Sequence, residues 1–288
     1  AGAHVHEHNL AMASFAREHD FCADSQWVQR PTPTGSTAFM GFRRMNGRVG
    51  TRNYIGVLTT VNCSATVARY IAQSFGQEDL DAFKNVDGVV PLTHQTGCGM
   101  AGNGEGMANL QRVLWGYAGH PNFGGILLVG LGCEQAQVSM MIDTFGFEPG
   151  KTFQYFNIQD LGGTRTTVAH GVARIKEMLP LVNDVAREPC PVSELSLALQ
   201  CGGSDAFSGV TANPALGYAS DLIVAHGGTT ILAETPEIYG AEHLLTRRAV
   251  NDKVAQKLLD RIAWWEDYTA RNGNELNNNP SPGTKPGV

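Results

Sequence analysis

The chain contains 288 residues, of which 34 are glycine, 42% are hydrophobic and only 17% are charged. This composition excludes an intrinsically disordered protein, and the lack of any apolar run near ~18 residues argues against a membrane span. A formal net charge of −6 argues against nucleic acid or an anionic membrane as a partner. We therefore predict a soluble, cytoplasmic enzyme in which the glycines mark tight turns or close approaches to a ligand.

The first 38 residues differ from the rest of the chain. His4, His6 and His8 alternate near the start, and alternate residues of an extended strand share one face. These three histidines are secondary candidates for a metal site. The proline-containing stretch that follows predicts a linker over residues 14–38.

From residue 39 onward, short apolar runs alternate with helical patterns. Strands are expected over residues 54–61, 86–92, 125–131, 152–158, 195–199 and 229–233. Helices are expected over residues 65–75, 107–118, 135–145, 162–178, 213–226 and 247–272. The alternation predicts an α/β fold over residues 39–288, a Rossmann-like variant with a mostly parallel sheet and flanking helices. If this region divides into two subdomains, the break falls near 180–195.

Four of the six cysteines lie just beyond the ends of expected strands, namely Cys63, Cys98, Cys133 and Cys201. Ligands of parallel sheets bind at that edge, and thiolates from several loops there suit iron, either as Fe²⁺ or as an iron–sulfur cluster. No two cysteines form a CxxC pair, which disfavours a local zinc ribbon. The structural alternative is that these are small buried residues in tight turns.

Candidate acid–base groups accompany the cysteines. His94 precedes Cys98, Glu134 follows Cys133, and Glu234 comes directly after the expected strand 229–233. A carboxylate or imidazole near a metal suits proton abstraction next to a carboxylate group. The alternative for each is a hydrogen-bonded group that caps its loop.

Anion contacts are expected from a second group of residues. Thr164 and Arg165 open a helix after two glycines, and backbone N–H groups at such helix starts bind carboxylate or phosphate. Arg52 and Arg165 offer bidentate contacts to a carboxylate, and Asp205 closes the QCGGSD loop. The GNGEG segment lacks the GxGxxG spacing, which disfavours a dinucleotide site.

Several long segments resemble the altronate/galactarate dehydratase family. They run in order through nearly the whole chain and include GVVPLTHQTGCGM, GILLVGLGCE, LGGTRTTVAHGVARIKEMLP and LQCGGSDAFSGVTANPALG. The opening GAHVHEHNL is similar to the last strand of the small β-clip (SAF-type) domain that precedes the catalytic region in this family. The resemblance thus implies that residues 1–13 are a remnant of that domain, and that the catalytic region is truncated at its C-terminus.

The resemblance implies a hydro-lyase that removes water from a sugar acid, an aldarate or aldonate such as galactarate or altronate. The product would be a 2-keto-3-deoxy acid, and iron would be the cofactor. On this hypothesis the cysteines hold iron, His94 or Glu134 is the base, and Arg52, Thr164, Arg165 and Asp205 contact the substrate. The alternatives are a lyase like the related sulfolactate sulfo-lyases, which expel sulfite, and a non-catalytic metal-binding module. A homodimer is the expected assembly, since symmetric self-association is common among soluble oligomers.

Overall fold

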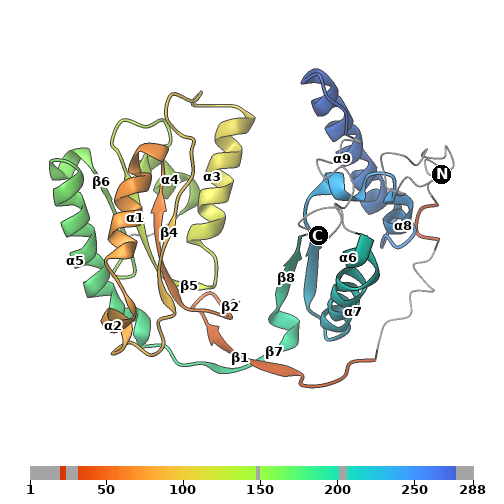
Figure 1. Ribbon diagram of the computed structural model, residues 1–288, viewed down its shortest axis with the longest axis horizontal. Coiled ribbons are helices and arrows are strands. Elements are labelled where there is room, and N and C mark those ends of the chain that lie inside the picture. Colours follow the sequence, from red (N-terminus) through yellow and green to blue (C-terminus); the bar gives the residue numbers. More distant parts are fainter. Residues whose placement is uncertain (1–19, 24–31, 147–149, 201–205, 277–288) are drawn as a thin grey trace. The chain divides into compact units, whose positions relative to one another are not determined.

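The structure is a computed structural model that describes residues 20–23, 32–146, 150–200 and 206–276. The chain divides into two compact units (Figure 1). One unit is residues 38–190, and the other combines residues 1–37 with residues 191–288. The predicted β-clip remnant, with His4, His6 and His8, lies outside the described residues, as do Cys201 and Asp205.

The unit formed by residues 38–190 is an α/β structure. Its strands are β1 (Ala38–Arg43), β2 (Val49–Gly50), β3 (Tyr54–Thr59), β4 (Gly88–Leu92), β5 (Phe123–Gly130), β6 (Phe153–Asn157) and β7 (Glu188–Pro191). Its helices are α1 (Ala65–Gln73), α2 (Gln77–Leu80), α3 (Glu105–Ala118), α4 (Val138–Phe145) and α5 (Thr164–Asn183). β7 ends at the boundary between the two units.

Four of these strands form the central sheet, in the order β4-β3-β5-β6. All three neighbouring pairs are parallel, and the register aligns Ile55 of β3 with Val89 of β4 and Gly125 of β5. The chain moves from β3 to β4 on one side and then returns to place β5 on the other side of β3. This reversal is a topological switch point, and ligands of open α/β sheets bind outside the carboxyl ends of the strands that flank it.

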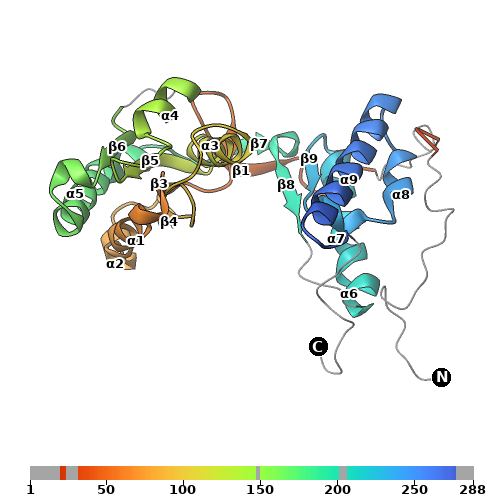
Figure 2. The ribbon, with the colours of Figure 1, turned by 90° about the horizontal axis from the view of Figure 1, so that it is seen from above.

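Helices cover both faces of the central sheet, as Figure 2 shows from above. One face packs Ile55 and Val57 of β3 against α1 and α5, through residues such as Ile71 and Ile175. The other face packs Leu58 against α3 and α4, with Leu110 among the contacts. Successive side chains of a strand point to opposite faces, so each strand supplies both cores and is apolar along its length.

A small sheet in the order β2-β1-β7 holds the two ends of this unit together. β1 is where the chain enters the unit and β7 is where it leaves. The Arg43 guanidinium lies 2.6 Å from the Glu188 carboxylate across these two strands. Because its ends are paired, residues 38–190 form a structure that closes on itself.

The second unit contains β8 (Ser196–Leu199), α6 (Ala206–Val210), α7 (Ala212–Ala225), β9 (Thr229–Leu232), α8 (Glu242–Thr246) and α9 (Asp252–Arg271). β8 and β9 are parallel, and Leu199 pairs with Leu232 at their carboxyl ends. The N-terminal segment contributes as well, since the Cys22 amide donates to the Thr246 carbonyl over 3.0 Å.

The predicted α/β class and the mostly parallel sheet with flanking helices are confirmed. All six expected strands form, four in the unit of residues 38–190 and two in the other unit. The long helix expected over residues 247–272 begins only at Asp252, after the separate short helix α8. Among the described residues, none of the helices has both the length and the apolar character needed to cross a membrane.

Candidate functional site

The loops that follow β3 and β4 meet at the carboxyl edge of the central sheet. The Asn62 amide, in the first loop, donates to the Thr96 carbonyl in the second over 2.9 Å. Gly97 adopts φ +98°, and a Cβ placed there would lie 2.8 Å from the Thr60 carbonyl oxygen and 3.1 Å from Val61 Cα. Only glycine permits this backbone-to-backbone contact. The two loops therefore form one surface beside the end of β3.

Glu134 joins the loop after β5 to the same strand end. Its Oε1 accepts a hydrogen bond from Thr60 Oγ1 over 2.5 Å and another from the Leu131 amide over 3.0 Å. Its Oε2 accepts from the Gly132 amide over 2.6 Å. Burial of the carboxyl raises its pKa, but the bonds from Thr60 and the backbone amides outweigh that effect and leave the pKa lowered. Glu134 is thus a buried carboxylate whose charge fixes the loop that carries Cys133.

His94 makes the corresponding connection from the loop after β4. Its Nε2 lies 3.0 Å from the Thr59 carbonyl, and its Nδ1 lies 3.3 Å from the Thr96 amide, which donates to it. These partners fit a neutral ring with the proton on Nε2 and a lone pair on Nδ1. Burial lowers the pKa of His94, while the bond to Thr59 acts in the opposite direction.

Three of the four predicted cysteines converge on this edge. Cys63, Cys98 and Cys133 are all exposed thiols, one on each of the three connected loops. Partial desolvation raises the pKa of the Cys63 thiol. A hydrogen bond between the Cys63 and Cys98 thiols and electrostatic interactions with Cys98 and Cys133 raise that pKa further. The structural alternative of small buried residues therefore does not describe these three cysteines, whereas Cys190, on β7, is buried.

Two features bear on whether these three thiols could hold iron: the chemistry of sulfur as a donor, and a buried hydroxyl beside Cys63 that lacks a hydrogen-bond partner among the described residues. Thiolate sulfur is a soft donor that suits iron. Ser64, directly after Cys63, is buried, and its Oγ has no hydrogen-bond partner in the part of the chain that the structure describes. In the same part of the chain, no three His, Cys, Asp or Glu side chains are arranged to hold a single metal ion. The thiols are thus soft donors, but within the described residues they form no preformed site for one ion.

Arg52 lies at the opposite edge of the sheet. It precedes β3, whose six residues separate it from the thiol loops by about 20 Å. Its guanidinium pairs with the Asp87 carboxylate over 3.2 Å, and Asp87 also accepts from the Asn53 amide over 2.6 Å. Within the described chain, Arg52 thus organises the start of β3 and is not brought together with the cysteines.

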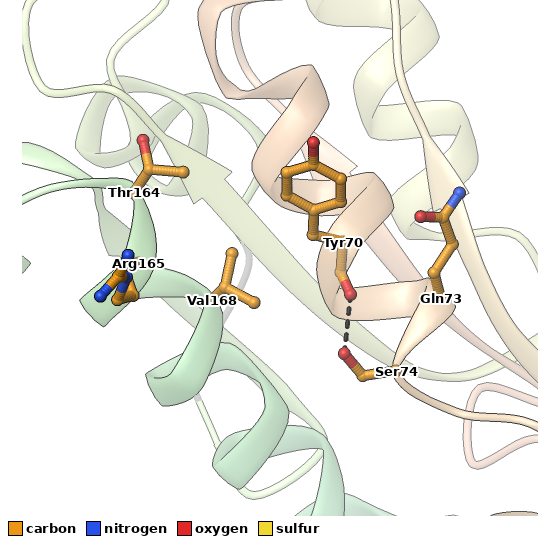
Figure 3. A pocket seen from close by; sticks show the side chains of 6 residues that line it. All are labelled: Tyr70, Gln73, Ser74, Thr164, Arg165 and Val168. Atoms are coloured by element: carbon orange, nitrogen blue, oxygen red, sulfur yellow. Dashed lines mark hydrogen bonds between the residues drawn. The ribbon is translucent and has the colours of Figure 1, made fainter.

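Thr164 and Arg165 line a hollow of about 550 Å³ between α1 and α5 (Figure 3). The other lining residues come from both helices: Tyr70, Gln73 and Ser74 from α1, and Val168 from α5. Tyr70 stands seven residues after Cys63, which corresponds to about 10 Å along a helix. The hollow is therefore a groove apart from the thiols, and its lining includes one guanidinium and several hydroxyl groups.

Glu234 belongs to the other unit. It follows β9, is exposed and adopts φ +60°, an uncommon conformation for a residue other than glycine. β8 ends at the same edge of the two-stranded sheet, since Leu199 pairs with Leu232. Glu234 and the start of the QCGGSD loop therefore share a strand-end edge within that unit.

The structure adds residues that the sequence patterns did not single out. Thr60 is buried at the end of β3 and bonds Glu134, and Gly97 brings the loop of Cys98 against Thr60. In the sequence, these residues are marked by two adjacent threonines at the end of an expected strand and by a glycine directly before Cys98. Neither signal identifies its partner, because the partner is set by strand order.

The order of the sheet and its helices on both faces define a doubly wound α/β protein, a class whose ligands bind at the carboxyl edge of the sheet. Residues 41–183 match the model of the D-galactarate dehydratase/altronate hydrolase second domain. Residues 192–287 match the D-galactarate/altronate dehydratase C-terminal domain. The chain belongs to the galactarate/altronate dehydratase family, as its motifs predicted.

Individual relatives agree with this assignment. The chain is 36% identical over 286 residues to altronate dehydratase of Bacillus subtilis, covering 99% of this chain and 56% of that protein. It is 40% identical over 261 residues to galactarate dehydratase (L-threo-forming) of Escherichia coli, covering 88% of this chain and 50% of that protein. It is 33% identical over 235 residues to the (2R)-sulfolactate sulfo-lyase subunit beta of Chromohalobacter salexigens, covering 81% of this chain and 54% of that protein. The chain therefore spans about half the length of the relatives it matches.

Proposed function

We propose that the protein acts in the dehydration of a sugar acid, an aldonate or aldarate such as altronate or galactarate, to a 2-keto-3-deoxy acid. The observation that carries this proposal is the junction of three strand-end loops at the switch point of the sheet. That junction gathers three thiols, a neutral histidine and a buried carboxylate at one edge. The printed names of two relatives, altronate dehydratase and galactarate dehydratase, supply the reaction and the substrate class.

The reaction requires a base that removes the proton on the carbon next to the substrate carboxylate. The hydroxyl on the following carbon leaves with a proton as water, and the resulting enol becomes the 2-keto acid. His94 is the proposed base, because Nε2 is committed to the Thr59 carbonyl while Nδ1 carries the lone pair. The 3.3 Å contact from the Thr96 amide to Nδ1 is long, and such contacts rearrange readily when a substrate binds.

Glu134 is proposed as a positioning residue in place of a base. Its bond from Thr60 holds the loop of Cys133 to the end of β3, and its bonds from the Leu131 and Gly132 amides fix the conformation of that loop. Using its charge to abstract a proton would break that connection. Arg165 and Thr164 are proposed to bind a carboxylate in the α1–α5 hollow, where their side chains are exposed. Arg52 has no part in this proposal, because its partner is Asp87 at the other edge.

Iron is the proposed cofactor, with Cys63, Cys98 and Cys133 as its ligands. Bound there, iron would supply a Lewis acid that stabilises negative charge on the substrate carboxylate and on the leaving hydroxyl. The residues of the chain hold and orient the thiols: Glu134 and His94 fix their loops, and Ser64 offers a buried hydroxyl beside Cys63.

A second candidate is a lyase that removes sulfite, because the chain is 33% identical to a sulfolactate sulfo-lyase subunit over 81% of its length. The decisive experiment assays galactarate, altronate and sulfolactate side by side with the 288-residue chain, anaerobically and with ferrous iron. We expect a 2-keto-3-deoxy acid from a sugar acid and no sulfite. Sulfite release from sulfolactate would favour the second candidate, and stoichiometric iron without either product would favour a non-catalytic metal-binding module.

A further inference from the structure

Two of the three strand-end thiols are in direct contact with each other. Cys63 shares a hydrogen bond with the Cys98 thiol, whereas its interaction with Cys133 is electrostatic. A second contact orients Cys63, since its Sγ donates to Asn62 Oδ1 over 3.6 Å. A disulfide bond is about 2.05 Å long, and rotation of the side chains brings two hydrogen-bonded sulfurs to that distance. The contact therefore identifies Cys98, rather than Cys133, as the thiol within bonding reach of Cys63.

The backbone holds the loops of these two cysteines side by side. The Asn62 amide, directly before Cys63, donates to the Thr96 carbonyl over 2.9 Å. Thr96 lies two residues before Cys98, and Gly97 between them packs without a Cβ against the backbone of the first loop. A disulfide requires Cα atoms about 4.4–6.8 Å apart, and bridging more distant ones forces the backbone to move. Because the loops are already paired directly before both cysteines, closing a bond between them does not require the loops to approach from a distance.

Both thiols are open to reagents in solution. Cys63 and Cys98 are exposed, whereas Cys190, on β7, is buried. Oxidation of cysteine favours accessible thiols, and a thiol that stands beside a second, resolving thiol is converted to a disulfide. Exposed disulfides are also the ones that thiol reductants reopen most readily. The pair thus has the access that a reversible bond requires.

We infer that Cys63 and Cys98 are a site of reversible oxidation, at which a peroxide converts the two thiols into a disulfide between the loops after β3 and β4. The first thiol attacks one peroxide oxygen, the O–O bond breaks, and the other oxygen leaves as water with the thiol proton, which gives a sulfenic acid. The second thiol attacks the sulfenic sulfur, the S–S bond forms, and the hydroxyl leaves as water with the second proton. Two thiols and one hydrogen peroxide thus give one disulfide and two waters. A dithiol reductant reverses the step by thiol–disulfide exchange and is itself oxidised.

Formation of this bond needs neither metal nor substrate, so the oxidation site goes beyond the proposed function. Its consequence for iron rests on that function. Metals bind the thiolate form of cysteine, and a sulfur in a disulfide has no thiolate to offer. Oxidation therefore removes two of the three proposed iron ligands, and reduction returns them.

The first test uses the full 288-residue chain, reduced and freed of metal with a chelator, and hydrogen peroxide as the oxidant. Thiols counted after denaturation are expected to fall by two from the six of the reduced chain, and dithiothreitol is expected to restore them. Trypsin separates the two cysteines, because it cuts after Arg69 and Lys84, which lie between them. We expect a linked pair of the peptides 53–69 and 85–112, in protein that still migrates as a single chain without reductant. Retention of all six thiols, or linkage of Cys63 to another cysteine, would overturn the inference.

The second test uses single serine substitutions. Cys133→Ser is the matched control, since its thiol lies at the same edge without the hydrogen bond that joins Cys63 to Cys98, and it is expected to form the same linked pair in the same yield. In Cys63→Ser, peroxide is expected to leave Cys98 as a thiol or as a sulfenic acid that dimedone traps, without a disulfide. Circular dichroism shows whether each variant is folded, and the first test needs no variant. Loss of the linked pair in folded Cys133→Ser would overturn the assignment of Cys98 as the direct partner.

Iron uptake distinguishes the inference from the proposed function. The oxidised chain is expected to take up at least about tenfold less ferrous iron than the reduced chain, since removal of an outer-shell partner alone costs that much affinity. A Cys63–Cys98 disulfide with no effect on iron uptake would leave the oxidation site intact and contradict the proposed iron ligands. Sugar-acid dehydration by a chain that forms no such disulfide would support the proposed function and overturn the inference.

Discussion

Thr59 and Thr60 explain how residues from three loops come to one place. The Thr59 carbonyl accepts a hydrogen bond from the His94 imidazole, and the Thr60 hydroxyl donates one to Glu134. The end of β3 is therefore hydrogen-bonded to the loops after β4 and β5. His94 and Glu134 have the residue types of an acid–base pair. Their hydrogen bonds show that each also holds the loop of a neighbouring cysteine, which is a structural task that residue type alone does not reveal.

The Glu134→Gln substitution tests the buried carboxylate. The amide keeps the volume but removes the charge. Its NH₂ group only donates, so one of the two backbone amides that now donate to the carboxylate loses its acceptor. We expect the opening free energy of β3 and β5 amides in hydrogen exchange to fall by about 1–3 kcal/mol. Glu177→Gln is the control, because that carboxylate pairs with Arg174 at the surface and its loss is expected to change stability by less than about 0.5 kcal/mol. Equal effects of the two substitutions would contradict a structural role for Glu134.

Two histidines with lowered pKa values, His94 and His120, predict how stability depends on pH. Burial lowers the pKa of His94, and burial together with the Arg48 charge lowers the pKa of His120. The unfolded chain then binds protons at these histidines more readily than the folded chain does. Above the unfolded pKa of about 6.5 they leave the free energy of unfolding unchanged, and as pH falls below that value they reduce it. We expect the free energy of unfolding to decrease between pH 7 and pH 5, by at most about 1.4 kcal/mol per pH unit for His94, and by less for His120, because solvent screens its exposed ring.

The His120→Asn variant checks the origin of that slope. Asparagine keeps a polar group near the turn at Asn122 but does not titrate between pH 5 and pH 7. Chemical denaturation at several pH values is therefore expected to give a shallower slope for the variant than for the unsubstituted chain. An unchanged slope would show that His120 does not contribute.

At the scale of the elements, the site depends on how closely two loops approach. The loop after β4 reaches the end of β3 only because Gly97 has no Cβ and adopts a left-handed backbone. Gly99, two residues later, also adopts positive φ at +67°, but a Cβ there would meet no atom within 4 Å. Substituting each glycine by alanine therefore distinguishes two effects on stability: both substitutions strain the backbone, but only the one at Gly97 also causes a steric collision.

Gly97→Ala and Gly99→Ala form a matched pair. Gly99→Ala is expected to cost about 1–2 kcal/mol, the strain of alanine in a left-handed conformation. Gly97→Ala adds a collision with the Thr60 carbonyl and Val61 Cα, which belong to backbone and cannot rotate away, so we expect a further loss of about 1–3 kcal/mol. The Gly97 variant is also expected to retain less iron, because its two loops each carry a thiol. Equal stabilities would mean that the loops move apart without cost.

The sequence predicts the class of the fold and the edge where the thiols lie, and the reasons are physical. Strands buried on both faces are apolar throughout, and parallel strands end at a common edge, so Cys63, Cys98 and Cys133 could be grouped before the structure was known. Arg52 precedes its strand, which places it at the opposite edge, but the order of the strands and the Asp87 partner were needed to see its role. The hydrogen bond of Thr60 to Glu134 and the close contact of Gly97 with Thr60 depend on tertiary pairing that no local pattern encodes.

At the scale of the whole molecule, residues 38–190 have the properties of an independent folding unit. They contain both hydrophobic cores of the central sheet, and their first and last strands, β1 and β7, lie in one small sheet. All three proposed thiol ligands belong to this unit, whereas Cys201 belongs to the other. A fragment of residues 38–190 therefore cuts the chain at the boundaries of this unit, one residue before the end of β7.

We expect the isolated fragment 38–190 to fold and to bind the same iron-containing group as the full chain. Its hydrogen-exchange protection at β3 and β5 should match that of the full chain, because both cores of the sheet are complete within it. Its iron content after anaerobic reconstitution should also match, since Cys63, Cys98 and Cys133 are all present. A folded fragment that binds no iron would show that the second unit supplies a ligand. An unfolded fragment would show instead that the second unit stabilises the sheet, which its paired chain ends and complete cores argue against.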